Sequence, residues 1–253
     1  NKRTMIALLV ISCIVTARGF TPTPTTTHAP EPTPTTTALN SASSATPDTK
    51  AAWGTFIDGE DADTTSLPQF TIPKTELLRR AAEILSPEVG IGTKDGGACL
   101  SPDFEFVAAV VGPIGREEYL SALGSFNLED GFDIIPNFYG MSVDPMQPNR
   151  VWFFNRVTAT HTGTFMGAEP SGKEIVSPPQ VHHLDFDEDG KVREYGFYTA
   201  DRRQGNTGGL GGAFGFMWAV GKPLPIPECQ PYKKSFRFRM LSFVGGFLQK
   251  LQK

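Results

Sequence analysis

The fold of this chain is decided by residues 180–199, QVHHLDFDEDGKVREYGFYT. Within them, the dipeptide Asp189-Gly190 separates two segments that are rich in β-branched and aromatic residues. Such a dipeptide between two extended segments is a strong signal for a β-hairpin, because both residues tolerate the backbone angles of a tight turn. The stretch therefore predicts two antiparallel strands.

The same composition extends upstream of this hairpin. It predicts four extended segments, Phe132 to Val143, Val151 to Thr162, Glu174 to Phe186 and Val192 to Thr199, with an earlier strand over Asp103 to Val111. Apolar residues at helical spacing predict two helices, Thr75 to Leu85 with Thr75 as its cap, and Arg116 to Phe126. Helices followed by hairpin-linked strands predict an α+β domain with an antiparallel sheet.

Several short motifs resemble those of a known family. They are THTGTFMG (160–167), PSGK (170–173), HLDF (183–186), GKVRE (190–194) and the helix-opening GRE (115–117). In order and spacing they resemble the SnoaL-like branch of the nuclear-transport-factor-2-like superfamily, over about Thr71 to Asp201. The resemblance implies a cone-shaped, barrel-like bent antiparallel sheet wrapped around helices, with an open-ended apolar cavity. That family includes cyclases, isomerases, dehydratases and non-catalytic binding domains, so the fold alone does not choose a function.

One histidine is the candidate catalytic residue. Where SnoaL-like cyclases carry an acidic general acid/base, the resemblance places His182, and an imidazole can do the same proton chemistry because it titrates near neutral pH. Strand alternation puts Gln180, His182 and Leu184 on one face, which we assign to the cavity, and His183 on the other. The alternative is that His182 only makes a hydrogen bond in a polar corner of the core.

Other residues are candidates for holding a ligand. Gln180, His161 and Tyr198 are expected to orient its polar groups, and apolar lining is expected from Phe106, Trp152, Phe154 and Trp218. His161 and His182 lack a third ligand, because His183 points to the other face, so no metal is expected. The acidic run at residues 185–190 imitates a calcium loop, but its twelfth position is Gly196 instead of a glutamate. No cofactor is expected either.

Several classes of protein do not fit the sequence. The net charge of −4 gives no overall basic field, so no nucleic-acid binding is expected. The chain has no G-x-S-x-G and no P-loop motif. Only Cys99 and Cys229 follow the leader, too few for a disulfide scaffold.

Two segments follow the predicted domain. Residues 202–232 combine glycines with Phe214, Phe216 and Trp218, and predict a pliable apolar flap followed by a proline-rich linker. Residues 233–253 have six basic residues, no acidic residue and an apolar stripe at helical spacing. This tail fits either a helix on an anionic membrane or a segment docked on the domain or a partner.

The N-terminal segment predicts targeting. Residues 1–19 have the basic start, short apolar run and small residues of a signal peptide. Residues 20–70, rich in Thr, Pro and Ser at their start, predict a disordered transit segment or linker. The string ARGFTP (17–22) resembles the cleavage motif of precursors routed through the secretory system into secondary red plastids. A plastid is therefore expected, with secretion as the alternative.

Two functions remain open. The first is a cofactor-independent isomerase, cyclase or hydratase in which His182 moves a proton on a small, mostly apolar molecule. The second is a non-catalytic plastid module that binds a pigment, a lipid or a protein partner in the same cone. A homodimer is compatible with both functions.

Overall fold

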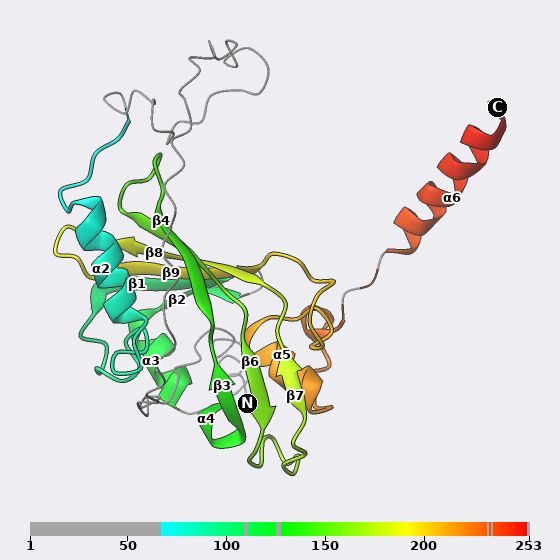
Figure 1. Cartoon of the computed structure of the whole chain (residues 1–253), viewed down its shortest axis with the longest axis horizontal. Helices are drawn as coiled ribbons and strands as arrows, with labels where there is room; N and C mark the ends of the chain where they lie inside the picture. The colour runs from blue at the N-terminus through cyan, green and yellow to red at the C-terminus, as the bar shows by residue number, and fades with distance from the viewer. Residues whose placement is uncertain (1–66, 109–110, 125–127, 232, 234, 252–253) are drawn as a thin grey trace, which may run out of the picture.

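The computed structural model describes residues 67–108, 111–124, 128–231, 233 and 235–251 (Figure 1). The predicted signal peptide, and the predicted linker up to residue 66, lie outside the described residues. Helices and strands are both abundant in the described part, and they surround one hydrophobic core. The predicted α+β class is therefore confirmed.

Two sheets form the body of the domain. The six-stranded sheet has the order β2-β1-β9-β8-β5-β4, and the three-stranded sheet has the order β3-β6-β7. The strands of the larger sheet are β1 (Leu100–Ala108), β2 (Val111–Gly115), β4 (Phe138–Val143), β5 (Arg150–Asn155), β8 (Gln180–Phe186) and β9 (Val192–Thr199). Those of the smaller sheet are β3 (Phe132–Ile135), β6 (Thr158–His161) and β7 (Glu174–Val176).

The larger sheet is mixed, not antiparallel as predicted. β1 pairs with β9 in parallel, while every other described pair of strands is antiparallel. Hairpin signals in a sequence concern strands that follow one another along the chain. They carry no information on β1 and β9, which lie at opposite ends of the domain's sequence.

Each of three predicted long strands bends and enters both sheets. The bend between β3 and β4 contains Pro136 and Asn137, whose φ of 51° is left-handed, and Pro178 and Pro179 precede β8. Proline has no N–H with which to continue a ladder, so it interrupts pairing at these points. The bends lie side by side, since Asn137 Nδ2 donates to the carbonyl of Arg156 at 2.9 Å. The result is a strongly curved surface.

The helices cover parts of this surface. Helix α2 (Lys74–Ile84) packs near β4 and β5 and buries Leu77, Ala81 and Ile84. It begins before Thr75, and Pro73 stands at its N-cap without a side-chain hydrogen bond, so the predicted threonine cap is wrong. Helix α3 (Arg116–Gly124) lies against β1, and α4 (Leu128–Gly131) leads into β3.

Residues 202–232 were predicted as a pliable flap and linker, but part of them forms a buried helix. Helix α5 (Gly212–Ala219) buries Phe214, Phe216 and Met217, and the Phe216 ring lies 4.8 Å from that of Phe132 on β3. Its backbone is also fixed at the C-terminal end, where Lys173 Nζ donates to the carbonyl of Ala219 at 2.7 Å. The helix α5 thus belongs to the core, and a short 3-10 turn, η3 (Pro227–Cys229), follows it.

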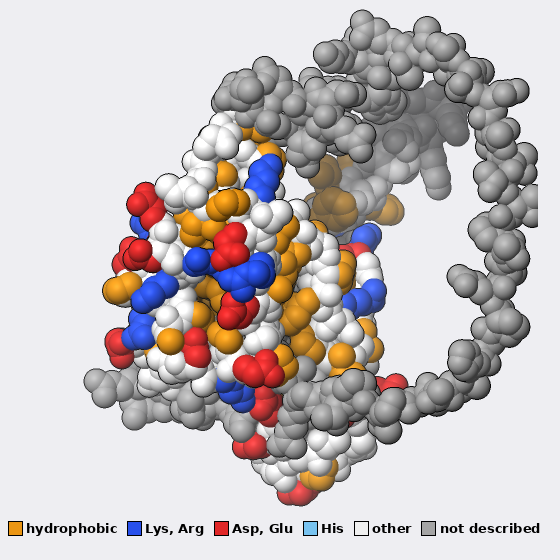
Figure 2. Space-filling model, turned by 60° about the vertical axis from the view of Figure 1, so that its left-hand side comes forward, with side chains coloured by type: hydrophobic (Ala, Val, Ile, Leu, Met, Phe, Trp, Pro, Cys, Tyr) orange, Lys and Arg blue, Asp and Glu red, His pale blue; other side chains and the backbone are white. Residues whose placement is uncertain are grey.

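The last helix stands apart from the domain. Figure 1 shows α6 (Phe236–Leu251) at the C-terminal end of the chain, away from both sheets. In the part of the chain that is described, no helix has both the length and the apolar character needed to span a membrane. On the face of the domain shown in Figure 2, Lys and Arg side chains lie among Asp and Glu side chains, without a large basic patch.

Candidate functional site

The pairing of β5, β8 and β9 separates the predicted site residues onto two faces. One face carries the row Phe153, His182 and Phe197. The opposite face carries the rows Trp152, His183, Gly196 and Phe154, Val181, Tyr198. Side chains alternate along a strand, so the expectation that Trp152, Phe154 and Tyr198 share one cavity face with His182 is wrong.

His182 lies among aromatic rings inside the domain. Its ring stacks on Phe153 at a centroid distance of 4.9 Å and on Phe197 at 5.6 Å, and only 1% of the residue is exposed. The imidazole Nδ1 lies 3.1 Å from the hydroxyl of Tyr195. Nε2 has no hydrogen-bond partner among the described residues. An unpaired buried nitrogen costs about 1–3 kcal/mol, which the surrounding packing must offset.

Burial makes this histidine a poor proton carrier. It lowers the pKa of His182 from 6.5 to about 3, with a smaller contribution from neighbouring His183. The imidazole is therefore neutral over the physiological range. Efficient general acid–base catalysis instead uses a group whose pKa lies near the working pH. The enclosure of the ring disfavours a proton-transfer role, and the catalytic assignment stays a prediction.

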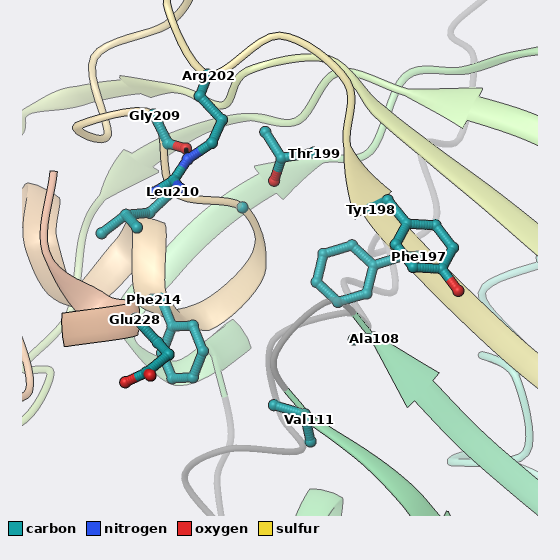
Figure 3. Close-up of a pocket in the computed structure, with 11 residues that line it drawn as sticks. Ala108, Val111, Phe197, Tyr198, Thr199, Arg202, Gly209, Leu210, Phe214 and Glu228 are labelled. Atoms are coloured by element: carbon teal, nitrogen blue, oxygen red, sulfur yellow. Dashed lines mark hydrogen bonds between the residues drawn. The ribbon is translucent and has the colours of Figure 1, made fainter. Parts of the chain in front are cut away.

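A pocket of about 140 Å³ opens near the ends of β1 and β9 (Figure 3). Its apolar lining comes from Ala108, Val111, Phe197, Leu210 and Phe214. Polar groups come from Tyr198, Thr199, Arg202, Gly209, Gly211 and Glu228. Phe197, Leu210 and Phe214 are buried, whereas Arg202 and Glu228 are exposed, so the charged side chains stand at the mouth.

Loop contacts hold the polar side of this pocket in place. Arg202 Nε donates to the carbonyl of Gly209 at 3.0 Å, which fixes the loop that follows β9. Gly211 packs so closely that an added Cβ would lie 2.7 Å from Thr199 Oγ1 and 2.9 Å from Gln180 Oε1. A side chain at position 211 would therefore push the loop away from the sheet. The glycine lets the backbone form part of the wall.

The pocket and His182 are neighbours, but they are separated. Phe197 lines the pocket and also stacks on His182, so its ring stands between the two. Gln180 is 1% exposed and lies behind Gly211 and Thr199 instead of lining the pocket. Of the predicted ligand residues, only Tyr198 contributes to this pocket.

The remaining predicted residues lie elsewhere. His161, on β6, has Nδ1 3.0 Å from Ser171 Oγ and its ring 5.0 Å from that of Phe132. Phe106, on β1, stacks on Tyr119 and on Phe197, so it belongs to the aromatic cluster around His182 without lining the pocket. Trp218, on α5, lies close to Gly208. The structure does not bring these side chains together with Gln180 or His182 into one cavity.

Sequence reasoning missed most of the pocket. Arg202, Leu210 and Glu228 come from loops and from η3, whose paths no periodic pattern reveals. Phe214 was noted only as part of an apolar segment. The one available signal was the group of glycines at 208–212, because glycine clusters mark places where backbone approaches another group closely.

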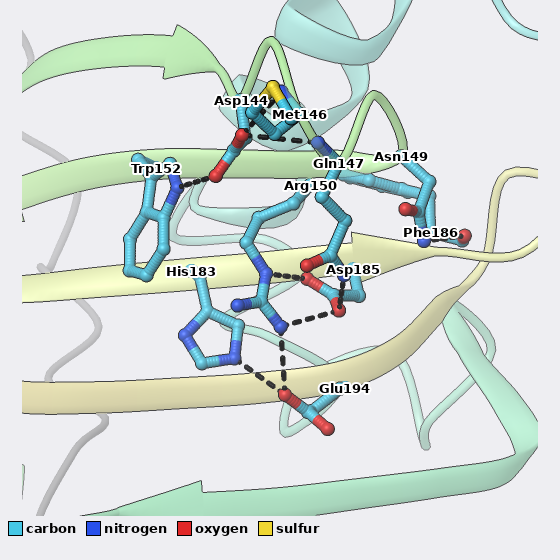
Figure 4. Close-up of polar contacts among 10 residues, drawn as sticks. All are labelled: Asp144, Met146, Gln147, Asn149, Arg150, Trp152, His183, Asp185, Phe186 and Glu194. Carbon is cyan, nitrogen blue, oxygen red and sulfur yellow. Dashed lines mark hydrogen bonds and ion pairs between the residues drawn. The ribbon is translucent and has the colours of Figure 1, made fainter. Parts of the chain in front are cut away.

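The opposite face of the sheet carries a charged network (Figure 4). Arg150 Nη2 contacts Asp185 Oδ2 at 2.7 Å and Glu194 Oε1 at 3.2 Å. Glu194 Oε1 also lies 2.8 Å from His183 Nε2. Burial lowers the pKa of His183, and the bond to Glu194 opposes this shift. In the described ranges, no three metal-ligating side chains gather at one point.

Comparisons with known proteins concern only the fold. No family model and no curated protein matches the chain. Among solved structures, it is similar to AclR, a putative hydroxylase from Streptomyces galilaeus (19% identity, 71% of this chain and 98% of that chain, TM-score 0.44). It is also similar to a putative SnoaL-like polyketide cyclase from Jannaschia sp. CCS1 (23% identity, 53% and 92%, TM-score 0.40). These likenesses are distant, so residue roles here rest on the chain's own geometry.

Proposed function

We propose that the domain binds a small, mostly apolar molecule, about the size of one six-membered ring, in the pocket between β9 and α5. The observation that carries this proposal is the separation of the pocket from His182 by the Phe197 ring. Without His182, the pocket has an apolar floor and a polar opening. Such a lining is typical of binding sites for small molecules.

The size of the pocket limits the ligand. A dry cavity of about 150 Å³ in another protein takes up benzene, so a volume of about 140 Å³ fits one ring. The Thr199 hydroxyl offers a hydrogen bond at one side, and Arg202 and Glu228 at the mouth favour a ligand whose polar end reaches solvent. The expected ligand class is therefore a small ring compound with one hydroxyl or carbonyl group, or the ring end of a longer molecule.

Phenol and benzene serve as probes in isothermal titration calorimetry. Both are expected to bind, and phenol more tightly because of the Thr199 hydroxyl. Thr199→Val should reduce the preference for phenol by about tenfold, the worth of one good hydrogen bond. The matched control is Thr160→Val on β6, outside the pocket, which should leave both affinities unchanged.

A second variant tests the location directly. Ala108→Leu adds apolar volume to the pocket wall, so it should abolish binding of both probes while the protein stays folded. Native mass spectrometry of protein isolated from its source should show a bound small molecule. If neither probe binds the wild type and the isolated protein carries no ligand, the proposal fails.

The competing proposal is an enzyme, an isomerase, cyclase or hydratase that uses His182. The observation in its favour is the unpaired Nε2, which a substrate could engage if the Phe197 ring turned aside. In an assay that detects turnover, His182→Gln should then remove most activity while the protein stays folded. Retained activity in His182→Gln would leave only the binding proposal.

We also propose a plastid as the compartment, with export from the cell as the alternative. This proposal rests on the sequence motif at residues 17–22 alone.

A further inference from the structure

Helix α6 exposes six large apolar side chains in residues 236–246, and four of them lie along one side. Phe236, Met240, Phe243 and Val244 are 73%, 55%, 76% and 47% exposed. Their spacing of four, seven and eight residues from the first places them on one face of an α-helix. Residues 236–246 of α6 are all exposed, so the domain does not cover the apolar face over this stretch.

The helix needs a partner to be stable. Isolated helices of about 15 residues are marginal in water, because most helical stability in proteins comes from packing of an apolar face. Gly245 and Gly246 lie within α6, and each weakens a helix by about 1 kcal/mol relative to alanine. Contact with a partner surface must therefore supply the stability that the sequence of α6 alone does not give this helix.

The charges around this face are all of one sign. Residues 233–253 contain six basic residues and no acidic residue. Within the described part of α6, Arg237 and Arg239 flank the apolar face, and Lys233 precedes the helix. Long basic side chains can lay their stems along an apolar surface while the charged end reaches outward. The complementary partner is thus anionic at its surface and apolar just beneath.

We propose that α6 lies flat on an anionic lipid membrane, with Phe236, Met240, Phe243 and Val244 in the boundary between headgroups and acyl chains. A basic amphipathic helix is the usual device for such binding. With 16 residues, α6 is about 24 Å long, which is shorter than the hydrocarbon core of a bilayer. It is suited to lie on a membrane and not to cross it.

Docking on the domain itself fits the observations less well. The pocket at β9 holds about one ring, whereas the apolar face of α6 presents the two rings of Phe236 and Phe243 together with Met240 and Val244. Residues 71–232 carry 13 basic and 21 acidic residues, a net −8, so the domain would also attract the tail by charge. Charge alone therefore does not distinguish the domain from an anionic membrane as the partner of α6. The apolar face favours the membrane, because the bilayer interior can accept all four of its side chains at once.

Flotation with vesicles tests the proposal. The chain beginning at Phe20, which lacks the predicted signal peptide, is mixed with vesicles of equal parts phosphatidylcholine and phosphatidylserine, or of phosphatidylcholine alone. It should float with the first kind, bind the second kind weakly, and lose binding in high salt. Replacing both arginines, Arg237→Gln and Arg239→Gln, should lower the partition coefficient by about 30-fold, roughly fivefold for each charge.

A matched pair of variants tests the face. Phe236→Ser with Phe243→Ser should lower partitioning at least about tenfold, because it removes the two largest side chains of the apolar face. Phe238→Ser is the control, since Phe238 is 53% exposed but lies on the other side of the helix. Circular dichroism should show helix gained on anionic vesicles by the wild type and by the control.

Two results would overturn the proposal. One is an intact chain that stays with the soluble fraction at low salt, above all if sedimentation then shows a dimer that disappears when residues 233–253 are deleted. The other is a Phe238→Ser variant that loses as much binding as the double variant, because the apolar face would then not be the contact surface.

Discussion

The depressed pKa of His182 makes a quantitative prediction about stability. An unfolded imidazole takes up a proton below pH 6.5, whereas the folded one does so only near pH 3. Between these values the unfolded state binds more protons, so stability falls as the pH is lowered through this window. From pH 7 to pH 4.5, the contribution of this one group amounts to a loss of about 2.5 kcal/mol.

The perturbation is His182→Gln, which removes the titrating group. Urea unfolding at a series of pH values should show that the free energy of unfolding of the wild type drops about 2.5 kcal/mol more than that of the variant. Tyr195→Phe serves as the control, because it removes the hydroxyl at Nδ1 but keeps the imidazole, and it should retain the wild-type pH dependence.

Parallel pH curves for the wild type and His182→Gln would refute the reasoning. They would mean that the folded imidazole takes up protons at ordinary pH, hence that solvent reaches it. In that case His182 could carry a proton, although the rings of Phe153 and Phe197 enclose it. This result would support the enzyme proposal.

Three further predictions concern the opposite sheet face and the leader. Gly196→Ala should cost about 2 kcal/mol or more of stability in urea unfolding, because the added Cβ would lie 2.2 Å from His183 Cε1. Asp185→Asn should cost about 2 kcal/mol in the same assay, because it leaves the half-buried charge of Arg150 with a weaker partner. A fluorescent protein fused after residue 50 should enter the plastid of an alga with a secondary red plastid, and Phe20→Ala should divert it to the secretory path.

Each of these predictions has a control or a contrary outcome. Gly115→Ala, where an added Cβ meets nothing within 4 Å, should change stability by less than about 0.5 kcal/mol. Asp133→Asn, at an exposed position on β3, should likewise change stability by less than about 0.5 kcal/mol. Stability losses equal to those of the test variants would contradict the steric and ion-pair arguments. Export of the unmutated fluorescent fusion would contradict the plastid proposal.

The sequence predicts the local hairpin well. Val192–Thr199 is a strand with the predicted bounds, and it pairs with β8 across the turn at Asp189-Gly190. Both facts depend on residues close together in the chain, where turn chemistry and alternation act directly. The same reasoning separated His182 from His183, and the structure places them on opposite faces of the sheet.

Other features depend on distant contacts and could not be predicted in this way. Alternation along one strand does not say which residues of the next strand stand beside it, so Trp152 was expected in one cavity with His182 although it lies beside His183 on the opposite face. Helix α5 lacks an amphipathic pattern because nearly all its side chains are buried, which made it look irregular. The pocket depends on how the loop after β9 folds back, and only Gly211 hinted at that approach.

The pairing of β1 with β9 also has a consequence for biosynthesis. Strand β1 pairs with β2, which follows it directly, but it gains its second neighbour only when residues 192–199 have been made, after every other strand of the domain. A nascent chain that has reached β8 would leave unpaired the two strand edges, on β1 and β8, that β9 covers in the folded domain. Long-range pairing of this kind forms slowly, and chains with such open edges are prone to aggregate. On the ribosome the domain should therefore remain open until its last strand emerges. A chain truncated before Val192 should be insoluble or held by chaperones instead of folding to a smaller stable form.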